Sequence, residues 1–297
     1  MISKILKAAK IILSKKDESP ITEWVEINSE NKRNYEHYII PKKIWFYWDS
    51  VDTPDIVDLC ISRASEICSG YEVTLLNPSN LHEYIDLPKI SDDVPISNKA
   101  DLIRLMLLEK HGGVWMDASI FLTQDIEWII SKLDRHESFL FYSDECTNDL
   151  KRPISENWFI VAPIGSKFIS DWKNEFYECI TSASPKIYYN DMDNRDYHLQ
   201  NLTRPDYLLC YISAIVVLNK SKYNILYASS GSTGHYLNYK HNWNGIAVAV
   251  ELLLRNKNRL AKTRLIKLNS TSRNGVQKLI KLNVINKNSL LGCFLKK

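Results

Sequence analysis

The chain has 297 residues, of which 45% are apolar and 25% charged, which is typical of a globular protein and sufficient for one large domain or one domain with an appendage. No run of about 18 apolar residues occurs, so we predict no membrane-spanning helix. The start, interrupted by lysines, does not resemble a signal peptide. Six irregularly spaced cysteines without a C-x-x-C pair favour a reduced, cytoplasmic protein over a zinc site or a disulfide framework.

The net charge of +3 conceals basic ends and an acidic middle. Residues 1–16 hold five lysines and no acid, and residues 251–297 hold 12 lysines and arginines but one acid, Glu251. The intervening residues 17–250 therefore carry 21 basic and 34 acidic side chains. Nucleic-acid-binding proteins usually gather their bases on one folded face, so this pattern speaks against nucleic acid. Basic ends suit an anionic membrane surface or an anionic ligand.

The first segment, MISKILKAAKIILSKK, predicts a basic amphipathic helix that lies on an anionic membrane or docks on the protein itself. We expect residues 17–38 to be polar and irregular, and the folded body to begin at Tyr38. The apolar positions of this helix are Ile2, Ile5, Leu6, Ala9, Ile12 and Leu13.

Strands alternate with helices along the folded body, which predicts an α/β fold with a mainly parallel sheet. The predicted strands are 39–48, 71–76, 114–122, 139–143 and 158–162. The predicted helices are 53–68, 97–110, 166–182 and 204–219, the first opened by Thr53 and Pro54. The last 35 residues mix short apolar runs with bases, and we assign no element there.

One carboxylate interrupts an apolar run in KHGGVWMDASIF, residues 110–121. In a strand, Asp117 and Ser119 would face the same way, at the carboxyl end, where open α/β sheets bind ligands. A buried charge needs a partner. Either a divalent cation, Mg²⁺ or Mn²⁺, joins Asp117 to a ligand's phosphates, or Asp117 caps a helix or meets an arginine.

The preceding helix adds two charged residues. Asp101 and Arg104 lie three apart and share a helix face. If Asn98 caps the helix, Asp101 stands at its third position, where the helix dipole favours an acid. Capping and a surface ion pair are therefore alternatives for these residues. Their combination with the Gly112–Gly113 turn and Asp117 favours a ligand site.

The stretch ISNKADLIRLMLLEKHGGVWMDASIF, residues 96–121, closely resembles the signature of the capsular polysaccharide synthesis glycosyltransferases, relatives of sugar transferases with a DXD motif. IPKKIWFYW at 40–48 resembles the family's first strand. ENWFI at 156–160, DYLLCY at 206–211 and IKLN at 266–269 resemble later blocks in the same order. The resemblance covers about residues 38–270. It divides the chain into a basic segment 1–37, a transferase domain 38–270 and a basic tail 271–297.

The resemblance implies a GT-A fold, a Rossmann-like α/β domain that binds a nucleotide sugar at the carboxyl edge of its sheet, here with a helical, basic C-terminal extension. It implies transfer of a hexose from a UDP-sugar, UDP-galactose or UDP-glucose, with retention. The acceptor would be a saccharide, lipid-linked, in bacterial surface polysaccharide synthesis. The enzyme would be cytoplasmic or peripheral on the inner face of the membrane. A protein acceptor and a non-catalytic sugar-binding domain are alternatives.

The resemblance also implies site residues. The donor-binding residues would be Trp45, Tyr47, Asp101, Arg104, Asp117, Ser119 and Lys267. The catalytic residues would be Asp117, Glu156 and Asn157, and Trp158 and Asp206 would bind the acceptor. A Mn²⁺ or Mg²⁺ ion would be held by Asp117, Ser119 and His235.

Ser119 departs from the family pattern, because it stands where the second aspartate of DXD is expected. A hydroxyl is a weaker ligand for a hard cation than a carboxylate, so metal dependence becomes an open question. Retention admits two mechanisms. One is a carboxylate nucleophile, for which Glu156 is the candidate. The other, which we prefer, is same-face attack in which the leaving phosphate accepts the acceptor's proton.

Overall fold

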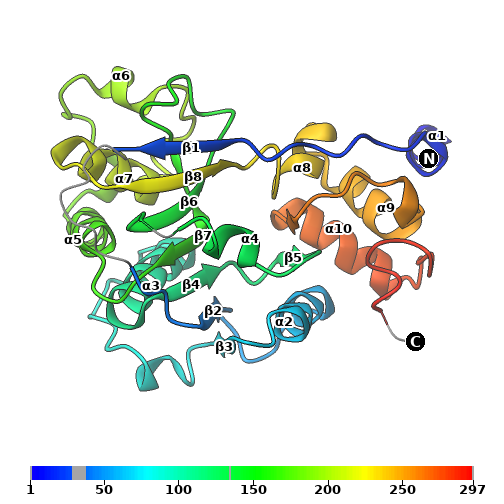
Figure 1. Cartoon of the computed structure of the whole chain (residues 1–297), viewed down its shortest axis with the longest axis horizontal. Coiled ribbons are helices and arrows are strands. Elements are labelled where there is room, and N and C mark those ends of the chain that lie inside the picture. Colours follow the sequence, from blue (N-terminus) through cyan, green and yellow to red (C-terminus); the bar gives the residue numbers. More distant parts are fainter. Residues whose placement is uncertain (1, 29–37, 134, 296–297) are drawn as a thin grey trace.

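A computed structural model describes residues 2–28, 38–133 and 135–295, with side chains from Leu6 onward (Figure 1). Its central sheet has seven strands in the order β1-β8-β6-β7-β4-β2-β3. Five of these run in one direction and β1 and β7 run against them, which confirms a mainly parallel α/β sheet. The strands are β1 (Trp24–Ile27), β2 (Lys43–Tyr47), β3 (Glu72–Leu76), β4 (Gly113–Met116), β6 (Ser138–Tyr142), β7 (Ser155–Ala162) and β8 (Ile225–Ser229).

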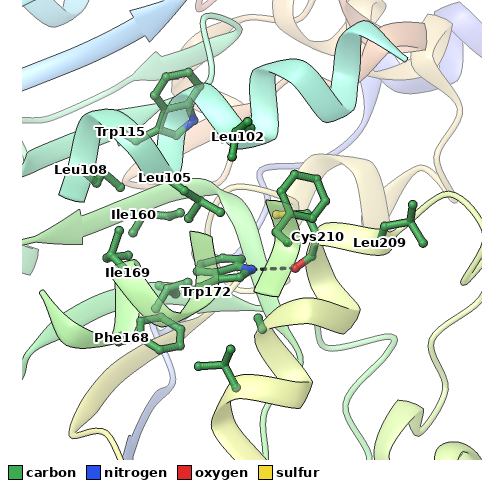
Figure 2. Close-up of a cluster of buried hydrophobic side chains, with 14 of the residues drawn as sticks. Leu102, Leu105, Leu108, Trp115, Ile160, Phe168, Ile169, Trp172, Leu209 and Cys210 are labelled. Carbon is green, nitrogen blue, oxygen red and sulfur yellow. Dashed lines mark hydrogen bonds between the residues drawn. The ribbon is translucent and has the colours of Figure 1, made fainter. Parts of the chain in front are cut away.

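Helices cover both faces of this sheet. The helices α3 (Ile96–His111), α5 (Lys167–Thr181) and α7 (Leu209–Lys220) pack on one face, and α2 (Asp55–Ile67) and α4 (Glu127–Ile130) on the other. Figure 2 shows the core under α3, where leucines of that helix meet Trp115 and Trp172. The Trp172 indole donates a hydrogen bond of 2.9 Å to the Cys210 carbonyl, so even this buried polar group is paired.

A second, smaller layer is built mostly from the C-terminal part of the chain (Figure 1). A two-stranded sheet, β5 (Ile120–Leu122) with β9 (Leu265–Lys267), packs beside α9 (Gly245–Leu254) and α10 (Ser270–Lys281). Only α10 falls in the C-terminal part that was predicted as a helical, basic extension, whereas β5, α9 and β9 lie within the range predicted for the transferase domain. The helix α1 (Ile2–Leu13) lies next to α9, while α6 (Arg195–Leu199) and α8 (Tyr236–Lys240) are short. Within the described residues, no helix is both long and apolar enough to cross a bilayer.

Two glycines set the entry into β4. Gly112 ends α3 with φ of 59°, and Gly113 follows with φ of 95°, a region that L side chains rarely adopt. A Cβ on Gly112 would lie 2.7 Å from the Ile164 amide nitrogen, and one on Gly113 2.6 Å from the Lys43 carbonyl oxygen. Only glycine therefore lets β4 enter between its neighbours at this angle.

The prediction that residues 17–38 are irregular is wrong for residues 24–27, while residues 29–37 lie outside the described part of the chain. Residues 24–27 form the edge strand β1, which pairs with β8 and lies before the predicted boundary at residue 38. Trp24 packs edge-on against Trp128, with ring centroids 5.5 Å apart. Asp17 accepts from the buried Arg255 at 2.5 Å. Four residues at a sheet edge carry too short a pattern to be recognised in sequence, because long-range pairing creates this strand.

The predicted strand 114–122 is divided in two. It leaves the central sheet after Met116, and the Ile120 amide donates to the Asp117 carbonyl at 3.0 Å, closing a turn over residues 118–119. The continuation, β5, then pairs with β9 instead. Asp117 and Ser119 therefore stand on a turn and not within one strand. The predicted helix 204–219 also begins later, at Leu209.

Candidate active site

A cleft of about 430 Å³ opens at the carboxyl ends of β2 and β4. This is the edge at which the sequence predicted ligand binding, because parallel strands end there next to each other. Five of the predicted site residues line it: Tyr47, Arg104, Asp117, Ser119 and Lys267. The remaining lining residues are Trp48, Asp49, Ile96, Ser97, Ala100, Trp115, Ala118 and Arg273.

Asp117 lies between two cationic side chains in this cleft. Its Oδ2 accepts from the Lys267 ammonium at 2.8 Å, and its Oδ1 is 3.3 Å from Arg104 Nη2. The Trp115 indole also donates to Oδ1, at 3.1 Å. Burial by itself would raise the pKa of Asp117, but Lys267 and Arg104 outweigh it and lower the pKa, so the carboxylate stays ionised.

Arg104 is buried behind Asp117 and joins three chain segments. Its Nη2 is 3.0 Å from Asp101 Oδ1, and its Nη1 donates to the Asn157 carbonyl. The Asn157 side-chain amide in turn donates to Asp101 at 3.0 Å. The Arg104 guanidinium also lies 5.0 Å from the centroid of the Trp115 ring. These contacts fix the guanidinium at the cleft wall.

Asp101 does not have the capping role considered from the sequence. The helix begins at Ile96, after Pro95 rather than Asn98, so Asp101 lies beyond the first turn. Burial raises its pKa to about 6, although Arg104 and the Asn157 amide favour the charged form. Asp101 is therefore ionised at neutral pH, and its burial in the charged form lowers the stability of the folded protein.

Replacing Asp101 with asparagine should remove a pH dependence of stability. Because the folded-state pKa is raised, folded protein binds more protons than unfolded protein between pH 3.8 and about 6. The Asp101 contribution thus falls as pH rises through that window, by about 2–3 kcal/mol. Urea midpoints measured across this range should show a weaker pH dependence in D101N than in the wild type. Equal pH profiles would contradict the assignment.

Glu156 lies in a separate, buried network. It accepts hydrogen bonds from Tyr211 and Ser230, each at 3.0 Å, and from the Trp158 indole. His235 Nε2 lies 3.5 Å away. Burial would raise the pKa of Glu156, but His235 and these hydrogen bonds lower it. Glu156 is not among the residues that line the cleft, which removes the geometric basis for a nucleophile there.

Three further predicted residues lie away from the cleft. Trp45 is fully buried, and its indole donates to the Gly112 carbonyl at 2.8 Å. Trp158 is buried and stacks on Phe141. Neither tryptophan is among the residues that line the cleft. Asp206 lines a different cavity, of about 730 Å³, which borders the start of α3 through Pro95 and Asn98.

The structure adds lining residues that the sequence did not indicate. Trp48 and Asp49 directly follow Tyr47, so their position in the sequence next to a predicted donor-binding residue could have indicated them. Arg273 comes from α10, in a region where no element was assigned. Its guanidinium lies 5.0 Å from the centroid of the Trp48 ring. Burial lowers the pKa of Arg273, and the neighbouring Asp117 carboxylate opposes that shift.

The predicted metal ligands do not fit a metal ion in this arrangement. Both Asp117 oxygens face cations, and the Ser119 hydroxyl donates to the Leu268 carbonyl at 2.8 Å. His235 Nε2 faces Glu156, and His235 is not a cleft residue. Among the described residues, no group of three or more His, Cys, Asp and Glu side chains could hold a metal ion.

A mainly parallel sheet with helices on both faces and a charged cleft at the carboxyl edge of β4 make this an α/β protein with a ligand-binding edge of the predicted kind. The profile of the family "capsular polysaccharide synthesis protein" matches residues 7–233. The chain belongs to this family. Among curated proteins, none matches the chain.

Several solved structures resemble the chain distantly. PaToxG glycosyltransferase is 13% identical with a TM-score of 0.36, and the match covers 74% of this chain and 80% of the PaToxG chain. A glycosyltransferase involved in glycosylation of the major capsid of PBCV-1 is 12% identical with a TM-score of 0.44, covering 81% and 98%. The galactosyltransferase LgtC, solved with donor and acceptor sugar analogs, is 8% identical with a TM-score of 0.41, covering 82% and 96%. At such values, no conclusion about this chain rests on them.

Proposed function

We propose that this protein is a glycosyltransferase that moves a hexose from a UDP-sugar, UDP-galactose or UDP-glucose, to a saccharide acceptor. The observation that carries the proposal is the cleft at the carboxyl edge of the sheet. There Arg104, Lys267 and Arg273 converge on the turn that holds Asp117. Cationic side chains in a half-enclosed cleft suit a nucleoside diphosphate, and the nearby carboxylates and aromatic rings suit a sugar.

The reaction breaks the bond between the anomeric carbon and the diphosphate oxygen, and the acceptor hydroxyl forms the new glycosidic bond. Negative charge grows on the departing UDP, where Lys267 and Arg104 would offset it. Asp117 is paired with both, so its role is to hold them in place. We favour same-face attack, in which the leaving phosphate takes the acceptor's proton, because Glu156 is engaged elsewhere.

A thermal-shift screen of UDP, UDP-galactose, UDP-glucose and their N-acetyl forms tests the donor. A ligand at 100 times its Kd stabilises a protein by about 2.7 kcal/mol, enough to raise the unfolding temperature measurably. We expect one UDP-hexose to give the largest shift, followed by release of UDP when a saccharide acceptor is added. A shift without turnover would favour a non-catalytic sugar-binding domain. The absence of any shift would refute the proposal.

We also propose that α1 attaches the enzyme to an anionic membrane, where a lipid-linked acceptor would lie. On this helix Leu6 and Leu13 are 64% and 74% exposed, next to the exposed Lys7 and Lys10. An apolar face with basic neighbours gives weak, reversible binding to anionic lipid.

Replacing Leu6 and Leu13 together with glutamate should release the protein from anionic vesicles in a sedimentation assay. The substitution removes apolar surface and adds repulsion from the lipid. Ile21→Glu is the matched control, because Ile21 is exposed but lies outside the helix. Vesicle binding that survives the double substitution would show that α1 is not the attachment site.

A further inference from the structure

We propose that this cleft holds the donor's diphosphate with the Lys267 ammonium and the Arg273 guanidinium, and that donor binding needs no divalent cation. The inference rests on the proposed function and deepens it, because it names the groups that offset the diphosphate charge. Four observations carry it: the state of Asp117 and Ser119, the anchoring of Lys267, the unpaired guanidinium of Arg273, and the charge of the cleft.

The positions that would bind a cation are already engaged by the chain's own donors. The Lys267 ammonium lies 2.8 Å from Asp117 Oδ2 and 3.5 Å from Ser119 Oγ, so it stands between the two side chains of the DXD-like turn. A divalent ion there would meet a fixed positive charge. The Ser119 hydroxyl donates its hydrogen bond to the Leu268 carbonyl. An aspartate at this position would point a carboxylate at that carbonyl, so the local structure favours serine.

Lys267 is built into the site by its backbone. It lies in β9 opposite Ile120 of β5, one residue beyond Ser119. Its carbonyl accepts from the Asn238 side-chain amide at 2.8 Å, and its amide donates to the Gly234 carbonyl at 2.8 Å. Its side chain is 11% exposed. The ammonium therefore belongs to the cleft wall, unlike a surface lysine that moves freely in solvent.

Arg273 is held in place from behind but has no anionic partner in hydrogen-bond contact. The first turn of α10 is capped by the Asn269 side chain, which accepts from the Ser272 amide at 2.8 Å. That turn packs against Gly245, where a Cβ would lie only 2.3 Å from the Thr271 carbonyl carbon. Among the described residues, none forms a hydrogen bond or an ion pair with the Arg273 guanidinium, which lies over the Trp48 ring. Its donors are thus available to a ligand in the cleft.

The charge of the lining agrees with a dianion. Three cations, Arg104, Lys267 and Arg273, and two carboxylates, Asp49 and Asp117, line the cleft, while Asp101 pairs with Arg104 behind its wall. Lys267 and Arg273 are therefore the two cations that a diphosphate with two negative charges would meet. A divalent ion in addition would place further positive charge beside two cations that cannot leave. The chain's own residues thus do what a metal ion does in other diphosphate sites.

Calorimetric titration of the full-length protein with UDP, once in EDTA and once in excess Mn²⁺, tests the inference. We expect UDP to bind in EDTA with an affinity that Mn²⁺ does not increase. Lys267→Ala and Arg273→Ala should each weaken UDP binding about 10- to 100-fold, the range expected for a lost charge-assisted hydrogen bond. The matched controls are Lys262→Ala and Lys278→Ala, which remove exposed lysines near β9 and on α10.

Each outcome decides a different point. UDP that binds only with Mn²⁺ would overturn the metal-free inference and leave the proposed function intact. UDP that binds under neither condition would overturn the proposed function and the inference with it. Wild-type affinity in R273A would also overturn the inference. That variant is informative even if K267A unfolds, because Arg273 has no described ion pair whose loss would disturb the fold.

Discussion

Asp117→Asn should reduce kcat/KM for sugar transfer by about 10²-fold while leaving the protein folded, because displacing a reacting group by about 1 Å can cost that much. The amide has the same shape as the carboxylate but no charge. It would therefore release the Lys267 ammonium at 2.8 Å and weaken the contact with Arg104 at 3.3 Å. Steady-state UDP release, with circular dichroism to confirm folding, measures the effect.

The control for this substitution is Asp92→Asn, which neutralises a fully exposed aspartate outside the cleft. It should leave kcat/KM unchanged. Activity of D117N within twofold of the wild type would show that the turn after β4 does not organise the cations of the cleft.

Arg104→Met should lower the free energy of unfolding by about 3–5 kcal/mol, more than Asp101→Asn or Arg152→Met. Methionine fills much of the same volume but removes the partner shared by Asp101 and Asp117, leaving two carboxylates in a poorly solvated site. It also leaves the Asn157 carbonyl without its donor. Urea denaturation at neutral pH measures the loss.

Two variants make this result specific. Arg152→Met removes an ion pair with Asp149 whose members are 28% and 38% exposed, and should cost no more than about 1 kcal/mol. The double variant R104M/D101N should recover part of the stability, because it removes one of the two unpaired acids and the residues are in contact. Strictly additive losses would contradict the coupling of Asp101 and Arg104.

The elements that the sequence predicted well are those whose pattern is local. The strands β2, β3, β6 and β7 and the helices α2, α3 and α5 all fall near their predicted ranges, since each carries several turns or residues of consistent periodicity. β1 and the C-terminal elements were not assigned. Their short segments become regular by pairing and packing with distant parts of the chain.

The candidate site divides in the same way. The sequence indicated Asp101, Arg104 and Asp117 because the helix, the glycine turn and the strand that hold them form one continuous motif. Arg273 could not be predicted in this way. Nothing in the sequence around it indicates that the first turn of α10 lies beside the end of β2. Trp45 and Trp158, which the family resemblance suggested as ligand contacts, are both buried, as aromatic residues in strands usually are.

By itself, the sequence determined the α/β class and the edge of the sheet where a ligand would bind, because strand order, glycines and the carboxylate after a buried strand are local features. Only the tertiary structure decided what surrounds that carboxylate. The pairing of β5 with β9 brings Lys267 across 150 residues of sequence to Asp117. Coulomb interaction depends on distance in space, not along the chain, so folding determines whether Asp117 meets a metal ion or a lysine.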